Sequence, residues 1–295
     1  MSISNPESES NGDGGLRSDS IETHIVGDSP QTRLSDYAVG KLESLPSRKS
    51  VKKAIKRGLL LVNGAISETG HWVQEGEILT VIADQMPRPV YERSIVVLFE
   101  DEHIAAVQKP ADLPVSGNSF RTLQNALSFN LAASSHKDAL AVPRPVHRLD
   151  RLTGGVVLIA KTLGAAAHLG GQFENRTVEK TYLAWVSGLI ELPMTFENSI
   201  DGKEAITAII PLKTITHRHF SELTLVEAKP KTGRRNQIRI HLSEAGYPIL
   251  GDLKFEGLKS GKGLFLFAKK ISFLHPTSNE PLQVEAIVPK KYKLT

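Results

Sequence analysis

Three short stretches of the sequence concentrate side chains that can attack carbon, move protons or hold anions. They contribute one group of each kind: a carboxylate at Asp150, a phenol at Tyr182 and a guanidinium at Arg239. Taken alone, such an aspartate is most often a turn cap or a surface charge, and a strand tyrosine most often packs in a core. Their chemistry therefore depends on a fold that brings them together. The stretches are 146–155 (VHRLDRLTGG), 179–184 (EKTYLA) and 231–242 (KTGRRNQIRIHL).

Other kinds of chemistry lack the residues they need. The 295 residues include no cysteine, which excludes disulfides, thiolate metal sites and cysteine nucleophiles. Gly261-Lys262 has neither the earlier glycine nor the following Ser or Thr of a phosphate-binding P-loop. The H-E-x-x-H and G-x-S-x-G motifs are also absent from the sequence. The sequence predicts no metal site and no cofactor.

The charge of the chain is unevenly distributed. The formal net charge is +4, but residues 1–29 hold six acids and one base, so the remainder carries +9. An excess of positive charge on a folded body favours polyanionic partners, because phosphate contacts release bound counterions. The acidic, Ser- and Gly-rich residues 1–29 are expected to form a disordered tail.

A small domain is expected over residues 31–84. Residues 48–57 are typical of a helix whose apolar positions Val51, Ala54 and Ile55 face inward. A strand ending at Val62 and the turn-forming pair Asn63-Gly64 follow. The other positions of the helix carry six bases and no acid: Arg48, Lys49, Lys52, Lys53, Lys56 and Arg57. Such a charge run is most often a solvated helix face, but its single sign suits phosphate binding.

Residues 85–94 contain two closely spaced prolines, Pro87 and Pro89, and are expected to form a linker. Beyond it, strand-like and helix-like segments mix over residues 95–290, which predicts an α+β domain. The period of two in residues 178–186 places Lys180 and Tyr182 on one face of a strand. Residues 237–244 have the apolar spacing of a helix.

The small domain resembles an RNA-binding module of the S-four type, named after a small-subunit ribosomal protein. The match lies in Ser47-Arg48, in residues 54–58 (AIKRG) and in residues 62–64 (VNG). The resemblance implies that the basic helix holds RNA phosphates, contacts that position RNA without reading its sequence.

The three chemical stretches, in this order, resemble the RluA family of pseudouridine synthases. Glu100-Asp101, Lys109-Pro110 and residues 272–276 (SFLHP) extend the similarity over about 100–290. The resemblance implies a mixed, mostly antiparallel sheet and isomerisation of uridine to pseudouridine in structured RNA. Four places depart from the family pattern: Gly154, residues 235–236, Phe255 and Phe267.

The resemblance also implies the roles of individual residues. Asp150 acts on the sugar, Tyr182 stacks on the uracil and accepts a proton, and Arg239 is the cation that keeps the carboxylate ionised, with Arg235 as a rival. Because a stacked base is out of reach, the uridine must be flipped out of the RNA. Contacts to substrate are expected from His147, Arg148, Lys180, Arg235 and Gln237.

Several alternatives remain open at this point. A catalytically silent RNA-binding or ribosome-assembly factor, and a synthase acting on transfer RNA, compete with a synthase of large-subunit ribosomal RNA. A monomer is the default expectation. No apolar run approaches the roughly 18 residues of a membrane helix, and the N-terminus lacks a secretory pattern, so a cytoplasmic location is expected.

Overall fold

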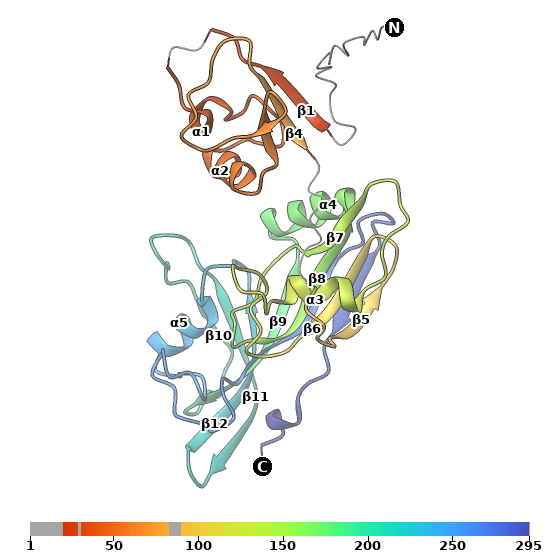
Figure 1. Cartoon of the computed structure of the whole chain (residues 1–295). Coiled ribbons are helices and arrows are strands. Elements are labelled where there is room, and N and C mark those ends of the chain that lie inside the picture. Colours follow the sequence, from red (N-terminus) through yellow and green to blue (C-terminus); the bar gives the residue numbers. More distant parts are fainter. Residues whose placement is uncertain (1–19, 29–30, 83–89, 295) are drawn as a thin grey trace, which may run out of the picture. The chain divides into compact units, whose positions relative to one another are not determined.

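The computed structural model describes residues 20–28, 31–82 and 90–294 (Figure 1). These residues belong to two compact units, one within residues 1–87 and the other within residues 88–295. Among the described helices, none is long and apolar enough to cross a membrane.

Unit 1 is a four-stranded antiparallel sheet with two helices. Helix α2 begins with a capping box, in which Ser47 and Ser50 each accept a hydrogen bond from the other's backbone N–H. The apolar side of α2 (Val51, Ala54 and Ile55) is buried in the core of the unit, as its periodicity predicts. The sheet order is β1-β4-β2-β3. The elements are β1 (Ser20–Ile25), α1 (Leu34–Tyr37), α2 (Arg48–Lys56), β2 (Leu60–Val62), β3 (Ala65–Ile66) and β4 (Ile78–Ile82).

The disordered tail expected over residues 1–29 extends too far along the chain. Within residues 1–29, the segment Ser20–Ile25 forms strand β1 and pairs with β4. Val26 follows it into the core with 1% of its surface exposed, and its N–H donates to the carbonyl of Glu77 at 2.8 Å. The strand exists because β4 supplies the hydrogen-bond partners, which local composition does not reveal. Residues 1–19 and 29 of the expected tail lie outside the described residues.

The expected linker also ends earlier than its composition indicated. Residues 85–89 lie outside the described part of the chain, but residues 90–94 pack on unit 2. The N–H of Tyr91 donates to the carbonyl of Asn125 at 2.8 Å, and the side chain of Asn130 donates to the carbonyl of Arg93 at 2.8 Å. These bonds to a helix fix a segment that has no regular structure of its own.

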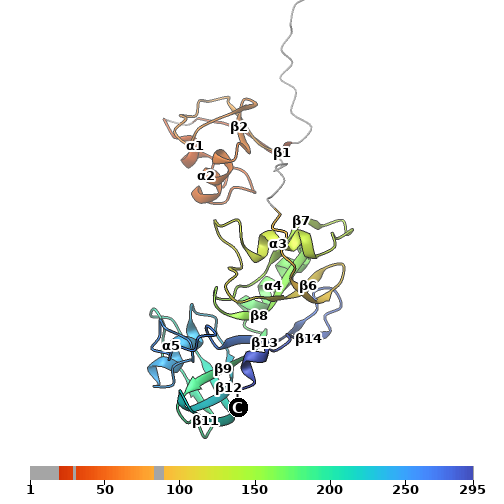
Figure 2. The same cartoon turned by 60° about the horizontal axis from the view of Figure 1, so that its bottom comes forward.

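Unit 2 is built on one large sheet. Its strand order is β10-β11-β12-β9-β13-β8-β6-β5, with β14 paired to β13 and β7 paired to β8. Every described pair is antiparallel except β13 with β8. The predicted α+β class with a mixed, mostly antiparallel sheet is confirmed. Figure 2 shows α5 beside β11 and β12 at one end of the sheet, and α3 and α4 beside β7 and β8 at the other.

The elements of unit 2 follow the chain in this order: β5 (Val96–Glu100), β6 (Ile104–Lys109), α3 (Leu123–Asn130), β7 (Ala139–Pro145), β8 (Gly154–Thr162), α4 (Leu163–Glu174), β9 (Glu179–Ser187), β10 (Met194–Phe196), β11 (Thr207–His217), β12 (Ser221–Pro230), α5 (Gln237–Glu244), β13 (Leu266–Leu274), β14 (Pro281–Glu285) and the 3-10 turn η1 (Lys290–Tyr292).

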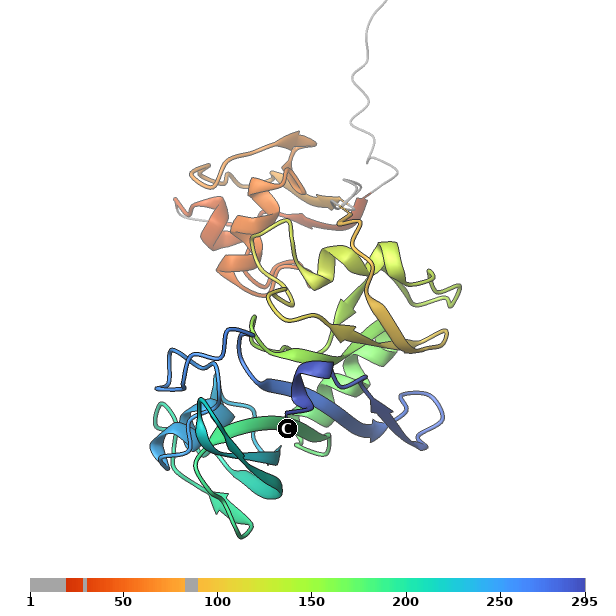
Figure 3. The same cartoon turned by 90° about the horizontal axis from the view of Figure 1, so that it is seen from below.

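The centre of the sheet is densely packed. All nine residues of β8 are buried, and β8 meets β13 where Gly155 lies opposite Ala268. Gly155 has φ +123°, and a Cβ there would lie 2.1 Å from the carbonyl oxygen of Ala268, so only glycine permits this approach. At the C-terminal end, η1 lies against the middle strands (Figure 3), and the indole N–H of Trp185 donates to the carbonyl of Tyr292 at 2.9 Å.

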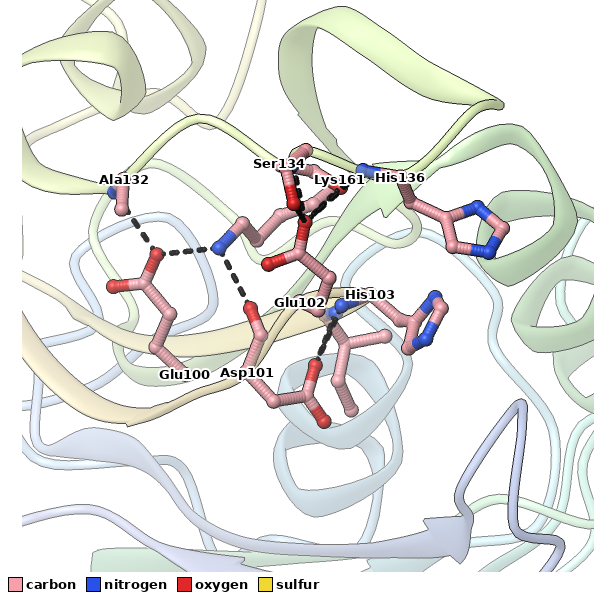
Figure 4. Close-up of polar contacts among 10 residues, drawn as sticks. Glu100, Asp101, Glu102, His103, Ala132, Ser134, His136 and Lys161 are labelled. Carbon is pink, nitrogen blue, oxygen red and sulfur yellow. Dashed lines mark hydrogen bonds and ion pairs between the residues drawn. The ribbon is translucent and has the colours of Figure 1, made fainter.

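Carboxylates at the end of β5 and in the turn that leads to β6 hold the segment between α3 and β7 (Figure 4). Glu100 accepts hydrogen bonds from the ammonium of Lys161 at 2.8 Å and from the N–H of Ala132 at 2.9 Å. Glu102 accepts from the hydroxyl of Ser134 and the N–H of His136, each at 3.0 Å. These bonds fix the start of β7, and the loop that follows β7 carries Asp150.

Candidate active site

A cavity of about 650 Å³ lies in unit 2, within the range of about 300–1,000 Å³ that is usual for small-molecule sites. It brings together the three stretches that the sequence analysis singled out. The loop between β7 and β8, the end of α4, the start of β9 and the segment that leads into α5 form its walls. The lining residues are 146–150, Thr153, 173–174, Arg176, Lys180, Tyr182, 230–239 and Leu266.

Asp150 and Arg239 face each other in this cavity. The Nη1 atom of Arg239 lies 3.7 Å from Oδ2 of Asp150, and the two side chains are 8% and 26% exposed. The carboxylate is thus open to the cavity while the guanidinium is buried behind it. Of the two arginines considered as its partner, the structure favours Arg239, because Arg235 is exposed on the cavity wall.

The guanidinium of Arg239 is held from three sides. Its Nε and Nη2 atoms donate to the two carboxylate oxygens of Asp252 at 2.6 Å each, and Nη1 donates to Oδ1 of Asn236 at 2.8 Å. The ring of Phe255 lies 4.7 Å from its Cζ atom, a cation–π contact. Burial lowers the pKa of Arg239, but the bonds and charge of Asp252, with a smaller contribution from Asp150, outweigh it and raise the pKa. Arg239 is therefore a fixed positive charge aimed at Asp150.

Lys180 and Tyr182 lie on one face of β9, as the alternation of the strand predicted, and both line the cavity. Burial and, to a smaller degree, the charge of Asp150 raise the pKa of the Tyr182 phenol above its usual range. Burial lowers the pKa of Lys180. In the resting site Tyr182 is thus a neutral phenol beside a carboxylate.

Lys109, at the end of β6, supports the loop that carries Asp150. Its ammonium is completely buried and donates to the carbonyls of Pro110, Leu113 and Arg151 at 2.9, 2.7 and 3.1 Å. Burial lowers the pKa of Lys109 to about 7, against the charges of Asp112 and Asp150. Three carbonyls match the three donors of the ammonium form, so Lys109 ties the residue after Asp150 to the sheet.

His147 also supports this loop. Its Nε2 accepts a hydrogen bond from the N–H of Leu158 at 3.0 Å, and its ring stacks on Phe173 with centroids 4.7 Å apart. Burial and the charge of Lys180 lower the pKa of His147 to about 3. The imidazole is therefore neutral, carries its proton on Nδ1, and has its Nε2 occupied.

The other predicted contacts differ in character. Arg148 and Arg235 are exposed on the cavity wall, where they can reach a ligand. Gln237 is buried, and its amide accepts from Thr232 Oγ1 at 2.7 Å and the N–H of Arg234 at 3.0 Å. Its amide nitrogen also donates to the hydroxyl of Thr207, the first residue of β11, and to the carbonyl of Ile206 just before that strand. Since all its hydrogen-bonding capacity is used, positioning the segment before α5 fits Gln237 better than the predicted substrate contact.

The basic residues of unit 1 lie where the sequence predicted them. Five of the six lie on α2 and are exposed, and the sixth, Arg57, lies just after the helix and is half-buried. The guanidinium of Arg48 pairs with Asp36 of α1, with Nε 2.7 Å from Oδ1. Lys49, Lys52, Lys53 and Lys56 present their charges to solvent.

Sequence reasoning missed the residues that hold Arg239. In the sequence, Asp252 lies outside the three chemical stretches, and Asn236 appears only as a departure from a motif. Asp252 is 2% exposed, and a buried aspartate requires a cationic partner, but burial is not visible in a single sequence. Among the described residues, no group of three or more histidines and acids has the geometry to hold a metal ion.

The lowered pKa of the half-buried His147 predicts a pH-dependent stability. An unfolded histidine has a pKa near 6.5 and the folded His147 a pKa of about 3, so the unfolded state binds more protons between these values. The part of the unfolding free energy that depends on a neutral His147 is fully present above pH 6.5 and is lost as pH falls toward 3. In urea unfolding followed by Trp185 fluorescence between pH 6.5 and 4.5, with Trp72→Phe in every protein compared so that Trp185 is the one tryptophan, the protein with His147 should lose stability more steeply than His147→Gln, by at most about 1.4 kcal/mol per pH unit.

The exposed His219 provides the control for this measurement. His219→Gln should follow the wild-type curve. Equal slopes for His147→Gln and the wild type would show that His147 is not held neutral by the fold.

The chain is similar to known proteins over most of its length. Residues 103–244 match a family model described as RNA pseudouridylate synthase. An uncharacterized RNA pseudouridine synthase of Aquifex aeolicus is 34% identical over 84% of this chain and 87% of its own length. The ribosomal large subunit pseudouridine synthase D of Xanthomonas campestris is 33% identical over 92% and 90%. Human RNA pseudouridylate synthase domain containing 1 has a similar structure, with a TM-score of 0.55 and 26% identity over 68% of this chain and 86% of that one. The chain therefore belongs to the RluA-like family of RNA pseudouridine synthases.

Proposed function

We propose that this chain converts uridine to pseudouridine in RNA at the cavity around Asp150. The observation that carries the proposal is the convergence of Asp150, Tyr182 and Arg239 in one cavity of about 650 Å³. The reaction breaks the bond between uracil N1 and ribose C1′ and forms a bond between uracil C5 and C1′. The proton lost from C5 is balanced by a proton gained at N1, so no oxidant and no net water are needed.

Asp150 is the group that acts on the sugar, as a nucleophile or as a base. Its carboxylate is the acidic side chain that faces the guanidinium of Arg239 across the cavity. A nearby cation stabilises the ionised form of a carboxylate that a bound ligand would shield from water. When Asp150 forms a bond to substrate its negative charge is consumed, and Arg239 stabilises it again when the bond breaks.

Tyr182 stacks on the uracil and accepts the C5 proton as a phenolate, which forms when the phenol gives its own proton to uracil N1 as the bond between N1 and C1′ breaks. Burial opposes the phenolate, and the charge of Asp150 opposes it further. When Asp150 forms a bond to substrate, its negative charge no longer raises the pKa of Tyr182. We therefore assign proton acceptance by Tyr182 to the stage at which the carboxylate is covalently engaged, because the resting phenol is a poor base.

The remaining cavity residues suit an RNA strand whose uridine has been flipped out. Arg148 and Arg235 are exposed cations on the wall, and we assign them contacts to the backbone or to the space that the base vacates. Lys180 is half-buried on the same face of β9 as Tyr182, and we assign it the role of a donor to the uracil. His147 and Gln237 position the walls.

Unit 1 is proposed to be the RNA-gripping module of the S-four type, and residues 88–295 the catalytic domain. The support is the exposed basic face of α2 over an apolar core. Large-subunit ribosomal RNA is the proposed substrate, because relatives from Xanthomonas campestris and Vibrio cholerae carry the names ribosomal large subunit pseudouridine synthase D and C. Pseudouridine mapping of ribosomal and transfer RNA from cells that lack the gene would identify the target.

The first test concerns the carboxylate. Asp150→Asn keeps the shape of the side chain but removes its charge, so it should abolish tritium release from carbon 5 of tritiated-uracil RNA. A decrease of about 1,000-fold or more is the order of magnitude expected for removal of a nucleophile. RNA binding should survive. Turnover like that of the wild type would reject the proposal.

The second test concerns the residue that holds Arg239. Asp252→Asn should lower kcat about 100-fold, which is the order of magnitude for a displacement of about 1 Å in a catalytic group. KM should stay within about threefold, since Asp252 does not line the cavity. Circular dichroism at the assay temperature controls for folding. An unchanged kcat in a folded variant would contradict the positioning role.

The third test concerns α2. Reversing the charges of Lys52, Lys53 and Lys56 to Glu should weaken RNA binding. It should also flatten the dependence of log K on log salt by about 0.7–0.9 for each RNA phosphate that α2 no longer neutralises. The matched control replaces the same three lysines by Arg, which keeps the charge and should keep the slope. If the Glu variant has the wild-type slope, α2 does not touch phosphate.

A further inference from the structure

Unit 1 carries an exposed aromatic side chain that the proposed function does not use. The chain has two tryptophans: Trp185 is 1% exposed in the core of unit 2, whereas Trp72 is 51% exposed in the loop between β3 and β4. Exposing half of an indole forgoes a large part of the free energy that its burial would supply. A surface indole in a rigid setting is therefore a candidate for a contact with a ligand.

The backbone on both sides of Trp72 is fixed. The N–H of Leu34 donates to the carbonyl of His71 at 2.7 Å, and the N–H of Val73 donates to the carbonyl of Thr32 at 3.0 Å. Val73 is 4% exposed and anchors the loop in the core. The indole is thus presented by an ordered segment, and little entropy is lost when a ligand binds it.

A guanidinium lies over the indole. The Cζ atom of Arg33 is 5.3 Å from the ring centroid of Trp72, and the two residues form an isolated antiparallel bridge. Aromatic rings and guanidinium planes are the two kinds of side-chain surface on which unpaired nucleobases stack.

This pair is linked to the basic face of α2. Arg33 precedes α1, and the N–H of Asp36, three residues later, donates to its carbonyl at 2.8 Å. Asp36 in turn pairs with Arg48, the first residue of α2, at 2.7 Å. Arg33 is therefore joined through Asp36 to the first residue of α2, a helix that carries five bases and no acid, with Arg57 as a sixth base at its C-cap. The nearby carboxylate of Glu77 is engaged by Nε2 of His71 at 3.0 Å and by the N–H of Gln74 at 2.9 Å.

We propose that Trp72 and Arg33 form a stacking platform for one unpaired base of the RNA whose phosphates bind α2. The inference rests on the proposed RNA-binding role of unit 1 and adds a preference for single-stranded RNA. Charge favours RNA over a protein partner, since the adjoining helix face offers only cations to solvent. Stacking tolerates every base, so the platform recognises an unpaired nucleotide and not a sequence.

The full-length protein provides its own probe. Trp72 fluorescence should be quenched when a 12-residue oligouridylate binds, while the buried Trp185 contributes a constant background. Trp72→Ala should lose this quenching and bind the oligouridylate about 5- to 150-fold more weakly, the range for loss of one stacked base. Trp72→Phe should recover most of the affinity. Arg33→Ala should weaken binding, and Arg33→Lys should restore the charge but not the stacking.

Two further measurements separate this inference from the proposed function. A blunt RNA duplex has no unpaired base, so its affinity should be the same for Trp72→Ala and the wild type. The salt slope of oligouridylate binding should also stay unchanged in Trp72→Ala. If Trp72→Ala binds oligouridylate as tightly as the wild type while the α2 charge reversal weakens binding, the platform is refuted and the role of α2 stands. If neither change affects binding, both are refuted.

Discussion

A single buried guanidinium between two carboxylates is the interaction on which this site depends. Arg239 gives two hydrogen bonds at 2.6 Å to Asp252, which is buried, and places its third nitrogen 3.7 Å from Asp150, which is open to the cavity. Removing one partner of a buried pair costs about 3–5 kcal/mol because a charge is left uncompensated. Asp252 thus satisfies the buried cation, and the remaining Nη1 of the cation is directed at Asp150, the carboxylate for which we propose the contact with substrate.

The fold brings these groups together from distant parts of the chain. Asp150 lies in the loop before β8, Tyr182 on β9, Arg239 on α5 and Asp252 in the segment before β13. Lys109 fixes the loop of Asp150 through the carbonyl of Arg151, and Gln237 fixes the segment that leads into α5. The mixed sheet makes this possible, because the parallel pairing of β8 with β13, across Gly155, brings the two halves of the site side by side.

The sequence predicted what local patterns and ordered motifs encode. Helix α2 followed from its apolar spacing, and the face of β9 with Lys180 and Tyr182 followed from alternation. Asp150, Tyr182 and Arg239 stood out because three stretches occurred in a recognisable order. Strand β1 could not be predicted, since it depends on pairing with β4, which lies far along the chain. Asp252, Phe255 and Lys109 could not be assigned for the same reason: their roles arise from burial and contact across the fold, not from neighbours in sequence.

The most direct test of the account is a double-mutant cycle on the single-turnover rate of tritium release, with Arg239→Lys, Asp252→Asn and the double variant. If Asp252 acts by holding the guanidinium, Lys at position 239 already loses the paired hydrogen bonds, and adding Asp252→Asn should lower the rate by less than about threefold. Effects that multiply in the double variant would show that Asp252 acts independently of Arg239, and would contradict the account.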